Sequence, residues 1–378
     1  MNRWSFIAAA PLALGLQLTT ATAHAADAIV VGRSLALSGP LHSYGEAKRD
    51  DGHAYIQKVN AAGGGGGKPI ELVTLDDAHA PAKTVENLKK IAAEREPTAF
   101  LGLFGVPTIA AALPVLVQLK IPAVGLTSGT DALRTPLNRY AFLVRASHSD
   151  EARKLVNHVK TVNITNISVI YSENPFGQSM KDSLLAALKK AGSSANAFKV
   201  DPAAKHAEAA VRQAVSGEPQ AVFLTMLSRA AVAVQTELAK ASFHGAQYTF
   251  SPVDTSTVTK QQGENARSLA ITQVAPIPSG MRVKVVANYL DPLKALGRGS
   301  PSFYGLEAFI EAKVLVECLK RAGPKPTPAA LVKGLETMHG FDPGGYYVGY
   351  YVGCKPDPHT GSLFVEIDMI NYSGIVSR

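Results

Sequence analysis

The sequence predicts an α/β protein with two similar lobes, each built on a mostly parallel sheet flanked by helices. Two observations point to this class: short apolar runs alternate with helical patterns, and the same rhythm starts again after residue 150. The length agrees, because 378 residues at about 150 per domain suggest two domains. No convincing residue-level repeat relates the two blocks, so their similarity lies in the rhythm alone.

The first block starts with a strand and then alternates helices and strands. We expect strands over 29–37, 70–75, 99–104 and 121–126, and helices over 45–59, 83–94 and 108–119. Within the second of these helices, Val85, Leu88, Ile91 and Ala92 fall on one stripe, which is the spacing of a helix with one buried side. Five consecutive glycines, 63–67, predict a flexible turn before the second strand.

The second block follows the same pattern, and a third stretch closes the chain. We expect helices over 151–162, 178–191, 207–215 and 230–240, and strands over 167–171, 197–200, 221–225 and 248–250. The third stretch predicts helices over 283–296, 304–321 and 329–338, and strands over 346–352 and 363–371. Periodicity alone does not assign this stretch to either lobe.

The N-terminal segment, residues 1–25, has the three parts of a secretory signal. Arg3 supplies the positive charge, 6–18 is an apolar run, and Ala23-His24-Ala25 is a small-x-small cleavage site. The apolar run is shorter than the roughly 20 residues that span a bilayer. We therefore expect an exported protein whose signal is cleaved near Ala25; the alternative is an uncleaved anchor helix.

The charge balance limits the kinds of partner. The chain has 38 Lys and Arg against 30 Asp and Glu, a formal net charge of +8, without a run of basic residues. So modest an excess favours solubility and capture of small anions, and it predicts no nucleic-acid partner.

Two cysteines, Cys318 and Cys354, lie in the last third of the chain. Export would permit a disulfide between them. The alternative is a buried thiol at Cys318 on a helix and an unpaired Cys354 in a turn.

Local motifs of catalysis and metal binding are absent. The glycine run before Lys68 is not a phosphate-binding loop, because Ala62 replaces its first glycine and Pro69 its Ser or Thr. No G-x-S-x-G or S-x-x-K motif occurs, and no two histidines stand four residues apart. Asp76, Asp77 and His79 are better explained as a solvated turn than as metal ligands, because adjacent side chains at a strand end point to opposite faces. We expect no catalytic residue, metal or cofactor.

Loops that follow the predicted strands carry most of the candidate binding groups. Open α/β sheets bind ligands at the carboxyl ends of their strands. The loops 38–45, 105–108 and 127–130 combine hydroxyls and glycines with helix starts or turns, where backbone N–H groups can bind a carboxylate. Tyr44 can supply an apolar wall with a polar tip. The alternative is that these residues are ordinary caps and turns.

The order of several short segments resembles a known family. These segments are Leu37-Ser38-Gly39-Pro40, Tyr44-Gly45, Val59-Asn60-Ala61-Ala62-Gly63-Gly64, Leu75-Asp76-Asp77, Pro81-Ala82-Lys83, Phe142-Leu143-Val144-Arg145-Ala146-Ser147 and the stretch from Tyr171 to Gly177. From about residue 28 to the C-terminus, the chain resembles the type I periplasmic binding proteins, specifically the leucine/isoleucine/valine-binding group that serves ABC importers.

The resemblance implies two hinged lobes joined by three crossovers that close on a ligand. Lobe 1 would comprise 26–146 plus 278–361, and lobe 2 would comprise 147–277 plus 362–378. The family's ligand contacts fall here on Tyr44, Val106, Pro107, Thr108, Thr127, Ser128, Gly129, Phe176, Met226, Leu227, Val253 and Asp254.

Two features of this implied site bear on the ligand. Tyr44 and Phe176 would enclose an apolar part of it from opposite lobes, and Thr108, Thr127 and Ser128 would hold a carboxylate. The family's amino-acid binders offer an acidic side chain to the ligand ammonium where Val253 stands here, with Asp254 beside it. This difference favours a carboxylate without an ammonium group.

The resemblance further implies a monomeric substrate-binding component of an ABC importer. Its partners would be a membrane permease and a small-molecule ligand, either an amino acid or an aliphatic or aromatic carboxylate. The alternatives are a ligand sensor of the same fold and, on an α/β scaffold without an identifiable titratable site, an exported enzyme.

Overall fold

The structure is a computed structural model that describes residues 28–267, 269–295, 297, 300–351, 358–371 and 376–377. The expected signal segment 1–25 and Cys354 lie outside the described residues. Cys318 is buried, and its Sγ lies 3.2 Å from the carbonyl oxygen of Leu331. Its pairing with Cys354 stays a prediction.

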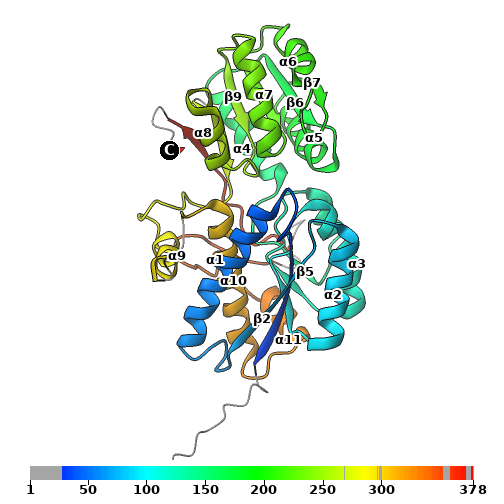
Figure 1. Cartoon of the computed structure of the whole chain (residues 1–378), viewed down its shortest axis with the longest axis vertical. Coiled ribbons are helices and arrows are strands. Elements are labelled where there is room, and N and C mark those ends of the chain that lie inside the picture. The colour runs from blue at the N-terminus through cyan, green and yellow to red at the C-terminus, as the bar shows by residue number, and fades with distance from the viewer. Residues whose placement is uncertain are drawn as a thin grey trace, which may run out of the picture.

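The first lobe contains a five-stranded parallel sheet in the order β2-β1-β3-β4-β5 (Figure 1). The strands are β1 (Ile29–Leu35), β2 (Ile70–Asp76), β3 (Ala99–Leu101), β4 (Ala123–Val124) and β5 (Ala141–Phe142). In register, Val31 of β1 pairs with Leu72 on one side and with Ala99 on the other. A parallel sheet is stable when helices cover both of its faces.

Helices cover this sheet on both sides. Helices α2 (Pro81–Arg95) and α3 (Val106–Leu119) bury Leu88, Ile91 and Ile109 against one face. The other core receives α1 (His42–Ala61), α9 (Lys284–Ala295), α10 (Phe303–Ala322) and α11 (Pro328–Glu336). The third stretch of the sequence therefore supplies helices to the first lobe. Periodicity alone had not shown to which lobe this stretch belongs.

The second lobe has a seven-stranded sheet in the order β12-β11-β10-β9-β8-β6-β7. Its strands are β6 (Ile167–Ser172), β7 (Asn196–Val200), β8 (Ala221–Thr225), β9 (Ala246–Thr249), β10 (Leu269–Gln273), β11 (Glu366–Ile370) and β12 (Val376–Ser377). The strands from β10 to β7 are parallel, whereas β11 and β12 add antiparallel pairs at one edge. One core contains α4 (His148–Thr161) and α5 (Pro175–Lys190), and the other contains α6 (Ala207–Val215), α7 (Ser228–Lys240) and α8 (Thr255–Gln262).

The chain crosses between the lobes three times. It leaves the first lobe between β5 and α4, returns between β10 and α9, and crosses again before β11 (Figure 1). At the first crossover, Ser147 and Asp150 form a capping box, each side chain accepting a hydrogen bond from the other residue's backbone N–H. This cap defines where α4 begins, immediately after the crossover.

One predicted strand is wrong. In the described part of 346–352, the backbone forms no strand and makes only an isolated bridge between Phe341 and Val348. The apolar run is buried instead as a loop: Tyr346 and Tyr350 belong to the first-lobe core, and the Tyr346 hydroxyl donates to the carbonyl of Val274 at 3.0 Å. Side chains that are buried by the packing of a loop give the same apolar pattern in the sequence as side chains that are buried in a sheet.

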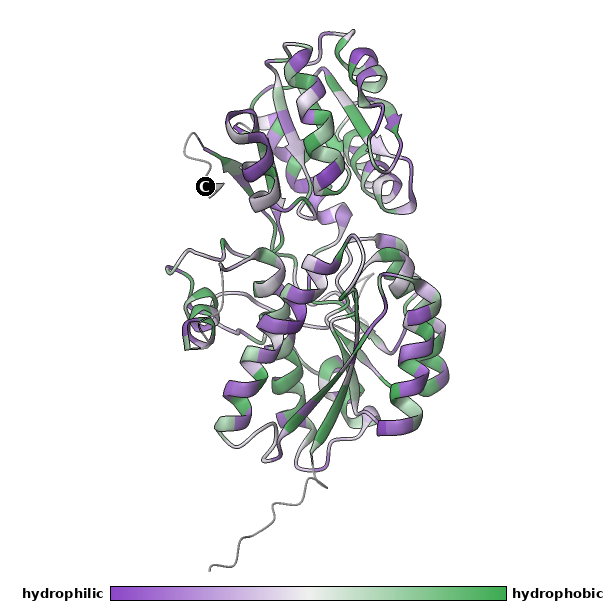
Figure 2. Cartoon of the chain, viewed as in Figure 1, coloured by the Kyte–Doolittle hydropathy of each residue, from purple (hydrophilic) through white to green (hydrophobic). Residues whose placement is uncertain are grey.

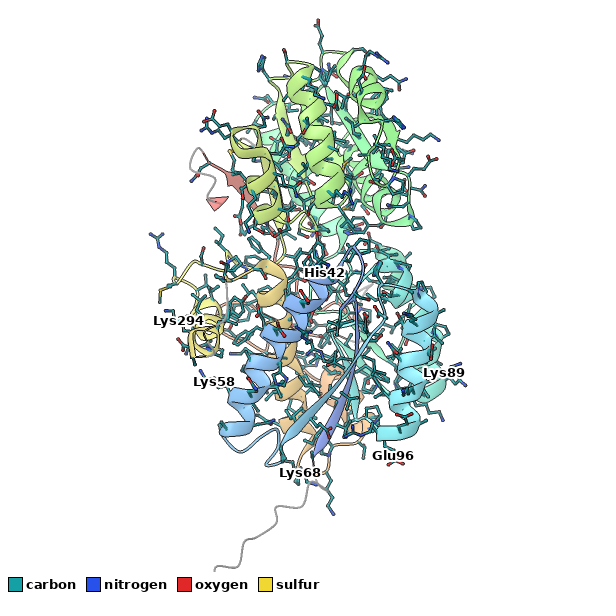
Figure 3. All side chains as sticks on the ribbon, viewed as in Figure 1. His42, Lys58, Lys68, Lys89, Glu96 and Lys294 are labelled. Atoms are coloured by element: carbon teal, nitrogen blue, oxygen red, sulfur yellow. The ribbon has the colours of Figure 1, made fainter. Side chains whose placement is uncertain are left out.

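Polarity follows this layered arrangement. Apolar residues concentrate on the strands and on the inward sides of the helices, while polar residues face outward (Figure 2). Lys58, Lys89 and Lys294 project from the outside of the first lobe (Figure 3). None of the helices in the described part of the chain combines the length and apolar character that a membrane crossing needs.

Candidate functional site

A cavity of about 570 Å³ lies between the two lobes. The first lobe contributes the start of α1 and the start of α10, and the second contributes the loops that follow β7, β8 and β9. In the second lobe these loops lie at the carboxyl ends of parallel strands, where α/β sheets bind ligands. The labelled His42, first residue of α1, marks the level of the junction in Figure 3.

Two aromatic rings of the first lobe, Tyr44 and Tyr304, line this cavity, and a third, Phe104, packs against both. Tyr44 of α1 stacks on Phe104, with ring centroids 5.7 Å apart, and meets Tyr304 of α10 edge to face at 4.6 Å. Phe104 and Tyr304 are also edge to face, at 6.1 Å. Mutually packed aromatic rings form a rigid apolar surface that can receive an apolar part of a ligand.

Two tyrosine hydroxyls of the first lobe reach the second lobe. The Tyr44 hydroxyl lies 3.1 Å from Ser228 Oγ, and the Tyr304 hydroxyl donates to the carbonyl of Pro252 at 3.0 Å. Burial raises the pKa of both tyrosines, so both hydroxyls stay protonated at neutral pH. The two lobes are therefore in direct contact beside the cavity.

The second-lobe wall of the cavity is polar. Asp254 caps α8: its Oδ2 accepts hydrogen bonds from the Thr257 backbone N–H at 2.8 Å, Thr257 Oγ1 at 2.6 Å and Ser256 Oγ at 2.7 Å. Its own backbone N–H donates to Ser228 Oγ at 2.8 Å. Arg229, next to Ser228, also lines the cavity and is exposed.

Three of the twelve predicted ligand contacts line this cavity, namely Tyr44, Leu227 and Asp254. The hydroxyls predicted to hold a carboxylate bond within the first lobe. Thr108 Oγ1 donates to the Gly105 carbonyl at 2.9 Å, and Ser128 Oγ accepts from the backbone N–H of Thr130 at 3.2 Å.

The other predicted contacts lie in different surroundings. Met226 and Val253 belong to a core of the second lobe. Val106 and Pro107 form the first turn of α3. Gly129 lies so close to the His148 ring that a Cβ there would be 2.2 Å from His148 Cδ2. Phe176 packs edge to face on the same ring, with ring centroids 5.7 Å apart. Phe176 is not among the residues that line this cavity, and the ligand roles of these residues stay predictions.

Among the residues that the sequence missed are Ser228, Arg229 and Tyr304, which line the cavity, and Phe104, which packs against Tyr44 and Tyr304. Ser228 and Arg229 follow a strand that was predicted at 221–225, so the rule that ligands bind after parallel strands would have found them. Tyr304 lies in the first turn of a helix far along the chain, and no local pattern connects it with Tyr44.

Beneath these rings, the first lobe contains a buried ion pair. Lys48 Nζ of α1 lies 2.7 Å from Glu311 Oε2 of α10, and Thr127 Oγ1 donates to Glu311 Oε1 at 2.8 Å. Burial raises the pKa of Glu311, and Lys48 partly offsets this effect. Gly125, with φ +73°, leaves room for the Glu311 side chain, because a Cβ there would lie 2.5 Å from Glu311 Cγ.

A second buried ionic cluster bridges the lobes at the first crossover. Arg145 lies 3.4 Å from Glu307 of α10 and 3.5 Å from Glu151 of α4, and it donates to Ser251 Oγ. Glu151 also accepts from Thr272 Oγ1 at 2.6 Å. Burial acts to lower the pKa of Arg145, but the two carboxylates outweigh it and the pKa is raised. One guanidinium thus joins a carboxylate from each lobe.

The buried His148 at this crossover predicts that stability depends on pH. Its ring is fully buried beside Gly129 and Phe176, and burial together with the cations Arg145 and Arg134 holds its pKa well below the usual range. The folded chain therefore keeps His148 neutral, whereas the unfolded chain protonates it below about pH 6.5. Because the unfolded state then binds more protons, stability from this residue falls as pH falls through that value, by at most about 1.4 kcal/mol per pH unit.

We expect urea unfolding between pH 7.5 and 5.5 to show a steeper loss of stability in the wild type than in His148→Gln. The readout is the slope against pH, which remains meaningful even if the substitution lowers stability at every pH. Parallel slopes would exclude His148 as the titrating group.

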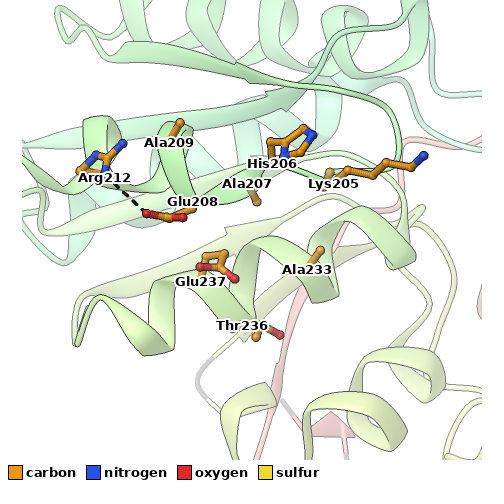
Figure 4. Close-up of a pocket in the computed structure, with 10 residues that line it drawn as sticks. Lys205, His206, Ala207, Glu208, Ala209, Arg212, Ala233, Thr236 and Glu237 are labelled. Atoms are coloured by element: carbon orange, nitrogen blue, oxygen red, sulfur yellow. Dashed lines mark hydrogen bonds and ion pairs between the residues drawn. The ribbon is translucent and has the colours of Figure 1, made fainter.

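A hollow of about 510 Å³ between α6 and α7 lies wholly within the second lobe (Figure 4). Its charged groups lie at the surface, and Arg212 pairs with Glu208 of its own helix at 3.5 Å. Exposed pairs of this kind are weak. Because one lobe alone forms this hollow, closure of the lobes would not enclose a ligand there. Among the described residues, no group of three or more His, Cys, Asp or Glu side chains is placed to hold a metal ion.

A cavity between two α/β lobes connected by three crossovers defines a two-lobed ligand-binding protein, and known proteins share this structure. An extracellular ligand-binding receptor from Verminephrobacter eiseniae superimposes with a TM-score of 0.86 at 26% identity, covering 93% of this chain and all of that one. A Leu/Ile/Val-binding protein homologue of Brucella melitensis is 22% identical over 313 residues, 81% of this chain and 83% of that protein. An amino acid binding protein of Pseudomonas aeruginosa is 26% identical over 172 residues. This match covers 45% of this chain and 46% of that relative, so the chain spans about half the length of that protein.

A family model described as periplasmic binding protein matches residues 28–361, and the chain belongs to this family. The predicted resemblance to the leucine/isoleucine/valine-binding proteins and the type I periplasmic binding protein fold are both confirmed. The protein is therefore a periplasmic binding protein, a member of a ligand-binding, non-enzymatic family.

Proposed function

We propose that this protein binds a small amino acid or organic carboxylate in the inter-lobe cavity and delivers it to the membrane permease of an ABC importer. The observation that carries the proposal is the cavity itself, which is lined from both lobes and bordered by the contact between Tyr44 and Ser228. Lobes that close around a ligand remove it from water and are stabilised by it. The names of the relatives from Pseudomonas aeruginosa and Brucella melitensis support an amino acid or a compound of similar size.

The proposal includes export and the division of the chain. The segment 1–25 acts as a signal that is cleaved near Ala25, and the mature protein works as a monomer in the periplasm. Lobe 1 comprises 26–146 plus 278–361, and lobe 2 comprises 147–277 plus 362–378. The positions of the three crossovers between the two sheets support these boundaries.

A thermal-shift panel on the mature chain tests the proposal. Ligands that bind only the folded state stabilise it by about 2.7 kcal/mol at a concentration of ~100 times Kd. We expect at least one amino acid or organic carboxylate in the panel to raise the Tm in a concentration-dependent way. A panel in which neither class moves the Tm would contradict the proposal.

Tyr44→Ala serves as the companion variant. It removes a ring that packs on Phe104 and Tyr304 and a hydroxyl that contacts the second lobe. We expect affinity for the bound compound to fall on the order of tenfold or more, which is about 1.4 kcal/mol, while the unliganded chain still unfolds cooperatively. Unchanged affinity would remove Tyr44 from the site.

A further inference from the structure

The two walls of the inter-lobe cavity differ in chemistry. From the first lobe the wall is mainly apolar, with Pro40, Leu41, Tyr44, Ala47 and Tyr304 among its residues. From the second lobe it is rich in hydrogen-bonding and charged groups, with Ser228, Arg229, Asp254, Ser256 and Thr257 among them. A ligand that matches both walls has an apolar body facing the first lobe and a polar head facing the second.

The first lobe has little capacity to bind a charged head. Thr127, one of its buried candidate hydroxyls near the strand ends, accepts a hydrogen bond from Lys48 Nζ at 2.6 Å and donates one to Glu311 at 2.8 Å. Thr108 and Ser128 are also engaged within their own loops. The cation Lys48 is paired with Glu311 and fully buried. Polar recognition therefore comes from the second lobe.

Two charged side chains of the second lobe line the cavity, and they differ in availability. Asp254 accepts three hydrogen bonds on Oδ2 as the cap of α8, so much of its capacity is used within the protein. Arg229 is exposed to the cavity, and no hydrogen bond or ion pair is formed by its guanidinium in the described part of the chain. A guanidinium offers paired N–H donors that match a carboxylate.

We propose that Arg229 binds the carboxylate of the ligand while the Tyr44–Tyr304 rings receive its apolar body, so that apolar monocarboxylates bind without needing an amino group. This inference rests on the proposed function and narrows its ligand class. The carboxylate supplies a negative charge to pair with the Arg229 guanidinium, and the apolar body packs against the half-buried Tyr44 ring and its neighbour Tyr304. An ammonium group would lie beside Arg229, where like charges repel.

Calorimetric titration of the mature chain with matched compounds tests this assignment. Leucine is compared with isocaproate, its deaminated counterpart, and with isocaproamide, which lacks the charge; phenylalanine and hydrocinnamate form a second matched pair. We expect each deaminated acid to bind at least as tightly as its amino acid and isocaproamide to bind at least about tenfold more weakly than isocaproate.

Arg229→Gln is the decisive variant. It should weaken isocaproate binding by about tenfold or more and bring isocaproate and isocaproamide to similar affinities, whereas Arg229→Lys retains part of the preference for the acid. Arg212→Gln is the matched control, because Arg212 is an exposed arginine of the same lobe that lines the α6–α7 hollow instead. Unfolding midpoints of all three variants show whether each remains folded.

The outcomes separate this inference from the function on which it rests. If leucine or phenylalanine binds and the deaminated acids do not, the inference is overturned and the proposed function stands. If the acids bind but Arg229→Gln leaves the ratio of acid to amide affinity unchanged, Arg229 is not the anchor. If no compound of either class binds, both the inference and the proposed function fail.

Discussion

Replacing Arg145 by methionine is expected to lower the free energy of unfolding by about 3–5 kcal/mol, since removing one partner leaves buried charge uncompensated. Arg145 is 4% exposed and lies between Glu307 of the first lobe and Glu151 of the second. Without the guanidinium, these two carboxylates would have to stay charged without their cation or take up protons. Hydrogen bonds from Ser251 and Thr272 to Glu151 would remain but carry no compensating charge.

The measurement is urea unfolding of the mature chain at neutral pH. Arg153→Met is the matched control, because Arg153 pairs with Asp150 at 2.7 Å but has a side chain that is 60% exposed. An exposed pair contributes about 0–1 kcal/mol. Similar losses for Arg145→Met and Arg153→Met would mean that the bridge between the lobes has no special importance for stability.

Lys48→Met should have an effect of the same size within the first lobe, about 3–5 kcal/mol at neutral pH. Its ammonium lies 2.7 Å from Glu311 Oε2 and 2.6 Å from Thr127 Oγ1, and its side chain is fully buried. Burial already raises the pKa of Glu311, and loss of Lys48 would raise it further. The penalty should therefore shrink as pH falls, because protonation of Glu311 removes the unpaired charge.

The double variant Lys48→Met/Glu311→Leu distinguishes loss of the ion pair from loss of packing. Replacing both members of a buried pair by apolar residues is often neutral, so we expect the double variant to regain most of the stability lost in Lys48→Met. Lys199→Met, which removes an exposed cation paired with Glu173 at 2.8 Å, is the surface control. A double variant as unstable as Lys48→Met, with no dependence on pH, would contradict an electrostatic origin.

These two clusters place charge beneath and beside the ligand cavity. Lys48 and Glu311 join α1 to α10, the two helices that carry Tyr44 and Tyr304. Arg145 lies at the first crossover, where the chain passes from one lobe to the other. Buried, hydrogen-bonded ion pairs are rigid, so they hold the aromatic wall and the crossover in one geometry.

Much of the fold could be predicted because its signals are local. The helix predicted over 207–215 and the strand over 221–225 occur within those bounds. Helices such as α5 begin a few residues earlier than expected: Asn174 caps its first turn by accepting a hydrogen bond from Gly177, and Pro175 opens it. Caps act over three or four residues, so they extend a helix beyond its apolar stripe.

Several elements were not predicted because their sequences lack a clear periodic signal. Strand β5 has only two residues, Ala141–Phe142, too few to show any periodicity. Helix α8 is mostly polar and depends on the Asp254 cap, and β10 is buried along its whole length, so its sequence does not alternate. Conversely, 346–351 looked like a strand because Tyr346 and Tyr350 are buried, although they pack as a loop.

The candidate site was likewise predicted only in part from the sequence. Tyr44, Leu227 and Asp254 were identified from the sequence through the family resemblance, and all three line the cavity. Thr108, Thr127 and Ser128 were expected at the ligand because hydroxyls in strand-end loops commonly bind anions. In the structure their hydroxyls bond to a carbonyl, to Glu311 and to a backbone N–H. Of these partners, only Glu311 is distant in sequence, 184 residues from Thr127, and a partner so far away leaves no local pattern.

The amino-acid sequence by itself determined the alternation of strands and helices and the two-block rhythm, because each depends on residues a few positions apart. Only the tertiary structure decided which side chains meet. Tyr44 and Ser228 are 184 residues apart and lie in contact across the lobes, and Lys48 and Glu311, 263 residues apart, form one ion pair. The physical reason is that side-chain contacts form between segments brought together by packing, and neither partner's local sequence specifies the other.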